Sequence, residues 1–339
     1  MKNKKSNQVS IPETPQIDGL TFRYFRGASD YPVIMEVFNA CKGMDGSEYT
    51  LTLEGVTHHF EHLERSDPFT DMIFVEVDEQ PVAYGRVGWY PESNGDYVYY
   101  ALGWIKPEWR HKGIGTAILK HNERRIREIA TEHPAEAAKY FQNDHNDKQP
   151  GVAVLLKTNG YQEIRWGYMM NRPIDAFLPE APMPKGLEVR LATEEDHYRA
   201  IFQAQNEAFR DHWGHGEVTE KDYQSWRSNP VTFNPSLWKV AWDGDEVAGM
   251  VLNYINKEEN EEYKRKRGYT EFISVRRPWR RRGLAKSLLV QSVQMFREMG
   301  MDDTCLGVDT QNPNHALDLY EGVGYKILLK DTVYRKLLE

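Results

Sequence analysis

The stretch Thr270-Glu271-Phe272-Ile273-Ser274-Val275-Arg276-Arg277-Pro278-Trp279-Arg280-Arg281-Arg282-Gly283-Leu284-Ala285 decides the fold. It begins as a short apolar strand, continues as a basic turn that contains Gly283, and opens a helix at Leu284. The helix is indicated by apolar residues that share one face at 3.6 residues per turn, namely Leu284, Leu288, Leu289 and Val293. A strand that leads through a glycine turn into a helix N-terminus presents free backbone N–H groups and the positive end of the helix dipole. The pattern therefore predicts an anion site suited to a pyrophosphate.

The turn itself supports this interpretation. Gly283 lets the backbone approach a ligand with no side chain in the way. The arginines add charge for phosphate oxygens. We expect the phosphates at Arg280, Arg281, Arg282, Gly283, Leu284 and Ala285. A short basic turn is also common on protein surfaces, so one copy of the pattern is weak evidence.

A second copy lies about half the chain earlier. The apolar strand Tyr97–Leu102 is followed by Arg110-His111-Lys112-Gly113 and by a helix that carries Ile118 and Leu119. The matching contacts would come from Ile105, Arg110, His111, Lys112, Gly113, Ile114, Gly115 and Thr116. The alternative is a relic loop that folds but binds nothing.

Other segments repeat in the same order, so the chain looks duplicated. Each half has a strand, a helix, a hairpin, a strand, a helix, a strand, a helix and a final strand, which indicates a mixed α/β fold with a central sheet. A proline-rich stretch separates the halves. We predict a flexible tail over 1–18, a first module over 19–175, a linker over 176–186 and a second module over 187–339.

Composition limits the class of protein. The 339 residues carry a net charge of −8, which argues against nucleic acid as the main partner. No apolar run approaches the ~18–20 residues of a membrane span. Cys41 and Cys305 lie in different halves and are expected to be buried free thiols of a cytoplasmic protein. His58, Glu61 and His62 have the spacing of a zinc-protease helix, but a further ligand and a larger domain would be needed, so no metal site is predicted.

The pattern Arg/Gln-x-x-Gly-x-Gly/Ala between a strand and a helix resembles the acetyl-CoA signature of the GNAT N-acetyltransferases, and two copies resemble the tandem members of that family. The resemblance implies two modules, each a mixed, mostly antiparallel sheet flanked by helices, with acetyl-CoA as cofactor. In that family the pantetheine arm lies where two central strands splay apart. Contacts to the arm would come from Ile273, Ser274, Val275 and Asn312. Asn312 has an alternative role as a helix cap.

The two halves differ at the positions where the family places proton-handling groups. Glu271 resembles the general base of the family, and the matching position in the first half is Ala101. Tyr320 resembles the general acid, and its counterpart is Leu156. The second module is therefore expected to be catalytic, and the first to bind cofactor or to act as a scaffold. The alternatives are a solvent-exposed carboxylate for Glu271 and a packing residue for Tyr320.

The loop after the first helix of the second module borders the acceptor pocket in this family. It contains His212 and Trp213, which we expect to contact the substrate; His212 is also a second candidate for the base. The alternative is a polar turn with Trp213 packed underneath.

The expected function is acetyl transfer from acetyl-CoA to a primary amine of a small molecule, by direct attack because neither cysteine lies at a motif. A non-catalytic acyl-CoA sensor or scaffold stays open, as does an acetyltransferase of protein lysines or N-termini. The substrate does not follow from the fold. A monomer and a homodimer both agree with the sequence.

Overall fold

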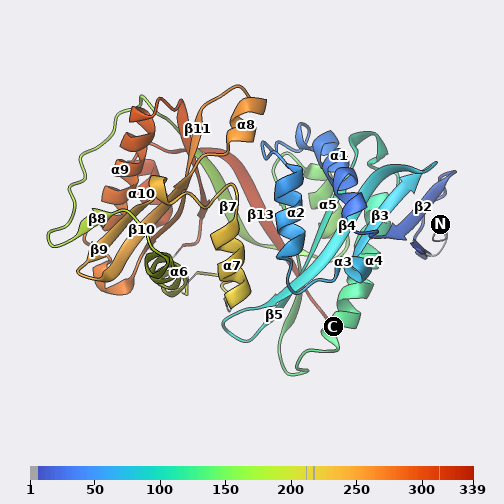
Figure 1. Cartoon of the computed structure of the whole chain (residues 1–339). Helices are drawn as coiled ribbons and strands as arrows, with labels where there is room; N and C mark the ends of the chain where they lie inside the picture. Colours follow the sequence, from blue (N-terminus) through green and yellow to red (C-terminus); the bar gives the residue numbers. More distant parts are fainter. Residues whose placement is uncertain (1–6, 211, 217, 313) are drawn as a thin grey trace. The chain divides into compact units, whose positions relative to one another are not determined.

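The computed structural model describes residues 7–210, 212–216, 218–312 and 314–339. The chain forms two compact units. The first comprises Met1–Arg165 together with Thr332–Glu339, and the second comprises Trp166–Asp331. Blue to green segments in Figure 1 belong mainly to the first unit, and yellow to red segments mainly to the second. Each unit is described by itself below.

The first repeat follows the predicted order of elements. Its strands are β1 (Gln8–Val9), β2 (Leu20–Tyr24), β3 (Met72–Val77), β4 (Gln80–Pro91), β5 (Tyr97–Ile105), β6 (Lys139–Asn146) and β7 (Gln162–Pro173). Its α-helices are α1 (Tyr31–Lys42), α2 (Leu53–Glu61), α3 (Pro68–Asp71), α4 (Ile114–Ala130) and α5 (Pro150–Thr158). Strands β1 to β5 pair in antiparallel order, and β5 then pairs with β6 in parallel. Val82 and Val87 of β4 belong to the two apolar clusters that contain the buried side chains of α4.

The second repeat has the same plan. Its strands are β8 (Glu188–Arg190), β9 (Lys239–Asp243), β10 (Glu246–Tyr254), β11 (Arg267–Val275), β12 (Asp303–Asp309) and β13 (Lys326–Leu337). Its α-helices are α6 (Glu195–Phe209), α7 (Glu220–Ser228), α8 (Lys257–Glu262), α9 (Leu284–Glu298) and α10 (Ala316–Gly322). Strands β8 to β11 are antiparallel, β11 and β12 are parallel, and β12 pairs with the end of β7 in antiparallel order.

The predicted helical face of α9 forms much of the core in the second unit. Leu284, Leu288, Leu289 and Val293 are all almost completely buried. They pack against apolar side chains of β9, β10 and β12. The prediction of two α/β modules, each with a mostly antiparallel sheet flanked by helices, is confirmed. Cys41 and Cys305 are buried and free, as expected.

The compact units do not coincide with the repeats along the sequence. From Trp166 onward β7 belongs to the second unit, where Gly167–Pro173 pairs with β12. The last residues of β13 belong to the first unit, where β13 borders β6. The final strands have equal length, 12 residues each, so each can occupy the same place in either sheet.

The segment predicted as a flexible tail is packed where the structure describes it. Gln8–Val9 pairs with β2, and Ile11 is buried in the cluster that holds the first turns of α4. Glu13 accepts two hydrogen bonds from Arg124 at 2.7 and 2.9 Å. The tail prediction is therefore wrong for residues 7–18, because Ile11 provides an apolar anchor that a polar flanking sequence conceals. Residues 1–6 lie outside the described part. No helix in the described ranges is long and apolar enough to cross a bilayer.

Candidate functional site

Two central strands of the second unit separate where the chemistry is expected. The parallel pairing of β11 and β12 covers Arg267 with Asp303, Gly268 with Thr304 and Tyr269 with Cys305. Beyond these three pairs β11 continues to Val275 and β12 continues to Asp309. No further residues of these two strands pair with each other in the described ranges. The backbone edges facing the resulting gap are thus available to a ligand. This matches the splay that the family resemblance implies.

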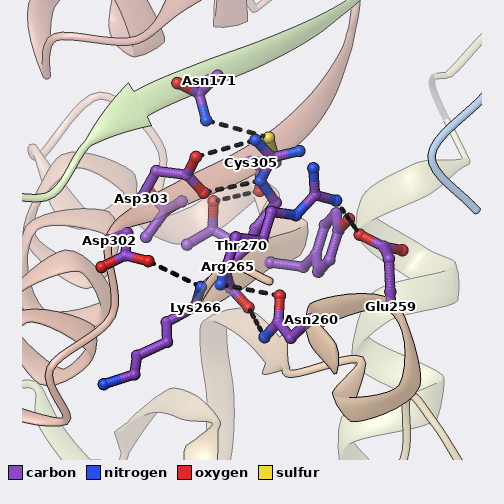
Figure 2. A network of polar contacts seen from close by, with 12 residues as sticks. Asn171, Glu259, Asn260, Arg265, Lys266, Thr270, Asp302, Asp303 and Cys305 are labelled. Carbon is purple, nitrogen blue, oxygen red and sulfur yellow. Dashed lines mark hydrogen bonds and ion pairs between the residues drawn. The ribbon is translucent and has the colours of Figure 1, made fainter. Parts of the chain in front are cut away.

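A network of hydrogen bonds and ion pairs joins β11 and β12 at the end where the two strands still pair (Figure 2). Arg267 donates from Nε and Nη2 to the two carboxylate oxygens of Asp303, at 2.7 and 2.9 Å. The backbone N–H of Lys266 donates to Asp302 at 2.9 Å. Bidentate pairs of this kind are geometrically specific. They fix the relative register of β11 and β12 just before the strands part.

Buried hydroxyl groups mark the point of separation. Thr270 Oγ1 donates to the carbonyl oxygen of Cys305 at 3.3 Å, and it lies 3.0 Å from the hydroxyl of Tyr325. Thr304 Oγ1 donates to the same Tyr325 hydroxyl at 2.8 Å. A side-chain bond thus replaces the backbone ladder at Thr270. The next residue of the strand is Glu271.

A β-bulge follows Glu271. Met250 pairs with Ser274 but Leu252 pairs with Glu271, so Val251 faces two residues of β11. Phe272, one of these two, has a φ of 49°, in the left-handed region. This conformation is unusual for a bulky residue and often marks a functional site. In the first unit β4 and β5 pair continuously, from Pro91 opposite Tyr97 to Ala83 opposite Ile105, with no register shift. Strand β5, the equivalent of β11, therefore lacks the bulge.

Glu271 and Tyr320 interact electrostatically within the second unit. Burial raises the pKa of the half-buried Glu271 carboxyl to about 7, although hydrogen bonds from the backbone of Gly307 and Phe272 lower it. Burial also raises the pKa of Tyr320, and the negative charge of Glu271 raises it further. The Tyr320 side chain is 6% exposed, and its hydroxyl makes no hydrogen bond with the described residues. The Glu271 carboxylate can therefore accept a proton near neutral pH, while the Tyr320 hydroxyl stays protonated.

The predicted phosphate loop has an open backbone. Arg281 and Gly283 both have left-handed φ angles, 60° and 82°, and Gly283 caps α9 without a side-chain hydrogen bond. No atom lies within 4 Å of the position that a Cβ on Gly283 would occupy. Leu284 is buried beneath the loop, while Arg281 and Arg282 are exposed. The first turn of α9, with Ala285, thus directs its N–H groups outward as an anion site requires.

Arg280 has a structural role in this loop. Its Nε donates to the carbonyl oxygen of Val275 at 2.9 Å, and its Nη2 donates to that of Ala208 at 3.1 Å. The side chain ties the loop to the end of β11 and to α6. Ile273 packs into the core, while Ser274 has a buried Oγ with no partner among the described residues.

Asn312 stabilises its own turn. Its Oδ1 accepts from the N–H of Asn314 at 2.8 Å, and His315, not Asn312, is the residue that precedes α10. This geometry favours a role for Asn312 within its own turn over the predicted contact with the cofactor.

The loop of the first unit has the same backbone but different side-chain contacts. His111 and Gly113 have φ angles of 59° and 89°. Arg110 again donates from Nε to the carbonyl oxygen five residues earlier, that of Ile105, at 2.9 Å, but its two other nitrogens donate to the carboxylate of Asp45 at 2.7 and 2.8 Å. The Lys112 ammonium lies 4.5 Å from the Trp109 ring centre.

The space around this loop is also more crowded. A Cβ on Gly113 would lie 3.1 Å from Pro15, and one on Gly115 would lie 3.3 Å from Ile105. Ile114 is buried in the core, and Thr116 lies in the first turn of α4. The first loop is therefore less available to an anion than the second. Ala101 and Leu156 are buried and apolar, so this unit lacks both proton-handling groups.

The loop that follows α6 holds His212 and Trp213 and borders the expected acceptor pocket. It contacts the bulge at Phe272 through aromatic rings. The rings of His212 and Phe209 are 4.3 Å apart, and Phe209 contacts Phe272 edge-on at 6.5 Å. Trp213 is 36% exposed, which disagrees with a tryptophan packed underneath the turn. Residues 211 and 217 of this loop lie outside the described ranges.

Sequence reasoning missed three features of the site: the bulge at Phe272, the backbone of Gly307 beside Glu271, and the hydroxyl cluster of Thr270, Thr304 and Tyr325. No local pattern indicates the hydroxyl cluster, because Thr270 and Thr304 lie on different strands and Tyr325 lies outside both. No group of three or more metal-ligating side chains occurs in the ranges that the structure describes.

Comparison with known proteins supports the duplication and the fold. The acetyltransferase (GNAT) family matches residues 32–148 and again 198–325. The chain is 26% identical over 234 residues to a mycothiol acetyltransferase of Geodermatophilus obscurus, covering 68% of this chain and 72% of that protein. It is 28% identical over 226 residues to the mycothiol acetyltransferase of Salinispora arenicola, covering 65% and 67%.

Solved structures agree. A GCN5-related N-acetyltransferase from Sphaerobacter thermophilus superposes with a TM-score of 0.71 at 25% identity, covering 95% of this chain and 97% of that chain. A tandem GNAT protein from the clavulanic acid biosynthesis pathway superposes with a TM-score of 0.68 at 11% identity, covering 94% and 99%. The second likeness concerns the fold alone.

Proposed function

Because the chain belongs to the acetyltransferase (GNAT) family, and so is an acyltransferase that uses acetyl-CoA, we propose that its second unit transfers the acetyl group to a primary amine of a small molecule. The observation that carries the proposal is the electrostatic interaction of Glu271 with Tyr320, at the residue of β11 where its pairing with β12 has ended. The first unit has neither group.

The residues of the second unit fit the cofactor. The backbone loop from Arg281 to Ala285 would hold the pyrophosphate, because its N–H groups open outward at the start of α9. The unpaired edge of β11 from Ile273 to Val275 would hold the pantetheine arm. The buried, unpartnered Ser274 Oγ is a further polar atom on this strand. Acetyl-CoA supplies an acetyl group activated as a thioester.

Glu271 would accept the proton of the incoming ammonium group. With a pKa of about 7, the carboxyl is substantially ionised at neutral pH, yet it is basic enough to take up a proton there. The backbone N–H groups of Gly307 and Phe272, which stabilise the charged form, would orient the carboxylate. Tyr320 would hold a proton for the departing sulfur, because its raised pKa keeps the phenol protonated. Direct attack is proposed because the two cysteines are buried, and burial raises the pKa of both thiols.

The acceptor is proposed to be a small molecule. The relatives named mycothiol acetyltransferase favour such an acceptor over a protein. His212 and Trp213 would contact it, since their loop reaches the Phe272 bulge through Phe209. Phe272 itself is 37% exposed next to Glu271.

The test is a panel of primary amines assayed for thiol release from acetyl-CoA, with mass spectrometry of the products. The panel includes amino sugars and their cysteine conjugates, amino acids, polyamines, and peptides with free lysines or N-termini. Acetylation of a small amine supports the proposal. Acetylation confined to peptides would identify a protein acetyltransferase, and no product with any amine would favour a sensor.

The pH dependence tests the base. For an amine that turns over, kcat/KM of the wild type should fall below a pH of about 7 as Glu271 becomes protonated. In Glu271→Gln this limb should disappear and the maximum rate should fall by about 10²–10⁴-fold. An unchanged profile in the variant would remove Glu271 from the mechanism.

A further inference from the structure

The first unit buries an arginine that has little to neutralise it. Arg86 lies in the middle of β4 and is 7% exposed. Alternation along the strand places it on the same face as Tyr84 and Gly88. Tyr84 belongs to the cluster packed against α1, so Arg86 lies on the face that α1 and α2 cover.

The side chain of Arg86 makes one hydrogen bond with the described residues. Its Nη1 lies 2.8 Å from Nε2 of His59 on α2, and its guanidinium lies 5.8 Å from the centre of the Phe60 ring. Because a guanidinium can only donate, His59 must accept with a neutral ring nitrogen and adds no opposing charge. Within the described ranges Arg86 has no ion-pair partner within 4.0 Å, and its Nε and Nη2, which have no hydrogen-bond partner there, are not completely shielded from solvent.

A second buried arginine of the first unit is paired with carboxylates. Arg23, 2% exposed, donates to both oxygens of Asp30 at 2.8 and 2.9 Å and also pairs with Glu76. The carboxylate that acts on Arg86 from a distance is Asp71, and it already accepts from Arg125 Nε at 2.8 Å. Burial lowers the pKa of Arg86, which reflects the cost of keeping a cation there. A largely buried charge with no carboxylate partner costs stability, and nitrogens that still reach solvent are open to a ligand oxygen.

We propose that the Nε–Nη2 edge of Arg86 binds the carboxylate of a small organic acid in the first unit. The two free nitrogens form the planar fork that matches a carboxylate, and the bond to His59 holds the third nitrogen and so orients the fork. His59 is itself exposed, so the arginine lies next to the surface along α2. The first unit would then be a binding module, which agrees with the apolar Ala101 and Leu156 at its catalytic positions.

The neighbours indicate the body of the ligand. A Cβ on Gly88 would collide with the phenol of Tyr100, so this ring lies across Gly88, beside Arg86. The Tyr100 hydroxyl has no partner among the described residues and can donate to a second oxygen. Phe60 lies on the guanidinium from α2. A carboxylate attached to a flat, apolar body fits these groups best, and benzoate is the simplest probe.

The experiment is a calorimetric titration of the full chain with benzoate, phenylacetate, acetate and succinate, with benzamide as the uncharged counterpart of benzoate and inorganic phosphate as a different anion. We expect saturable binding of an aromatic carboxylate and none of benzamide. Arg86→Lys should weaken it at least tenfold, because an ammonium lacks the fork, and Arg86→Met should abolish it. Arg26→Met, at an exposed arginine of the same unit, should change nothing.

A second measurement separates binding from a structural role. Removal of an unpaired buried charge should raise the melting temperature of the ligand-free Arg86→Met variant. In the wild type, the Arg86 Nε–H resonance, assigned by its absence in Arg86→Lys, should shift on addition of benzoate; this holds even if Arg86→Met does not fold. No binding of any carboxylate, tighter binding of phosphate, or equal binding by Arg86→Lys would overturn the proposal.

Discussion

The raised pKa of Glu271 has a consequence for stability that does not depend on knowing the substrate. The pKa of this carboxyl rises from 4.5 to about 7 on folding, because burial disfavours the charge. The folded state therefore binds the proton more tightly than the unfolded state, and stability falls as the pH rises from about 4.5 to 7. At about 1.4 kcal/mol per pKa unit, the ionised group costs the folded protein about 3 kcal/mol above pH 7.

Glu271→Gln removes the charge and keeps an oxygen that can accept from Gly307 and Phe272. The variant should be more stable than the wild type at pH 8, and its advantage should shrink by about 2–3 kcal/mol at pH 5, where the wild-type carboxyl is protonated in the folded state. Urea denaturation at both pH values measures this, provided that the m-values agree.

The matched control is Glu258→Gln, at an exposed carboxylate of α8 in the same unit. It should show no such difference between the two pH values. An equal stability gap between Glu271→Gln and the wild type at pH 5 and pH 8 would refute the reasoning, because the carboxyl would then be ionised alike in the folded and unfolded chains.

Two further changes test neighbouring groups. Tyr320→Phe should leave the affinity for acetyl-CoA nearly unchanged and lower kcat by about 10²-fold or more, since the hydroxyl makes no hydrogen bond with the described residues but would donate to the departing sulfur; equal kcat in steady-state assays would remove the acid role. Thr270→Val should lower the free energy of unfolding by about 1–2 kcal/mol, because it deletes the bonds to the Cys305 carbonyl and the Tyr325 hydroxyl. Urea denaturation that shows no loss would mean that these bonds do not hold the strands at the point of separation.

The overall fold and the two loops could be predicted because local sequence determines them. A strand, a glycine in the left-handed region and an apolar helix face occur at both Gly113 and Gly283, and the structure has both turns. Comparison of the halves also singled out Glu271 and Tyr320 as candidates, because the same positions in the first half hold apolar residues. These inferences needed only the order of the elements and the spacing of the residues along the sequence.

The remaining features depend on tertiary structure. Phe272 takes a left-handed backbone conformation that nothing in its residue type predicts, since turn-forming residues usually carry that role. Similarly, β7 and β13 are equivalent strands of equal length, so sequence pattern could not reveal that each completes the sheet of the other repeat's unit. Ile11 is a lone apolar residue in a polar segment, and only its burial shows that the segment is packed.

The contacts of the loop arginines were also beyond sequence reasoning. Arg110 and Arg280 were both expected at phosphates, but each donates to a backbone carbonyl five residues earlier, and Arg110 also pairs with Asp45. The partner Asp45 lies far from the motif in sequence, so no local pattern could show that the first loop has lost part of its positive charge.

The central claim is that the second unit holds the acetyl-CoA used for transfer. It is tested most directly by calorimetric titration of acetyl-CoA into the wild type, Gly283→Val and Gly113→Val. Both glycines have left-handed φ angles, 82° and 89°, that valine resists, and a Cβ on Gly113 also meets Pro15 at 3.1 Å, so the first loop is perturbed at least as strongly as the second. Circular dichroism checks that each variant folds. We predict that Gly283→Val loses both acetyl-CoA binding and acetyl transfer. Gly113→Val should keep acetyl transfer, with wild-type affinity for acetyl-CoA in the second unit. Intact binding and turnover in Gly283→Val, or their loss in Gly113→Val alone, would contradict the account.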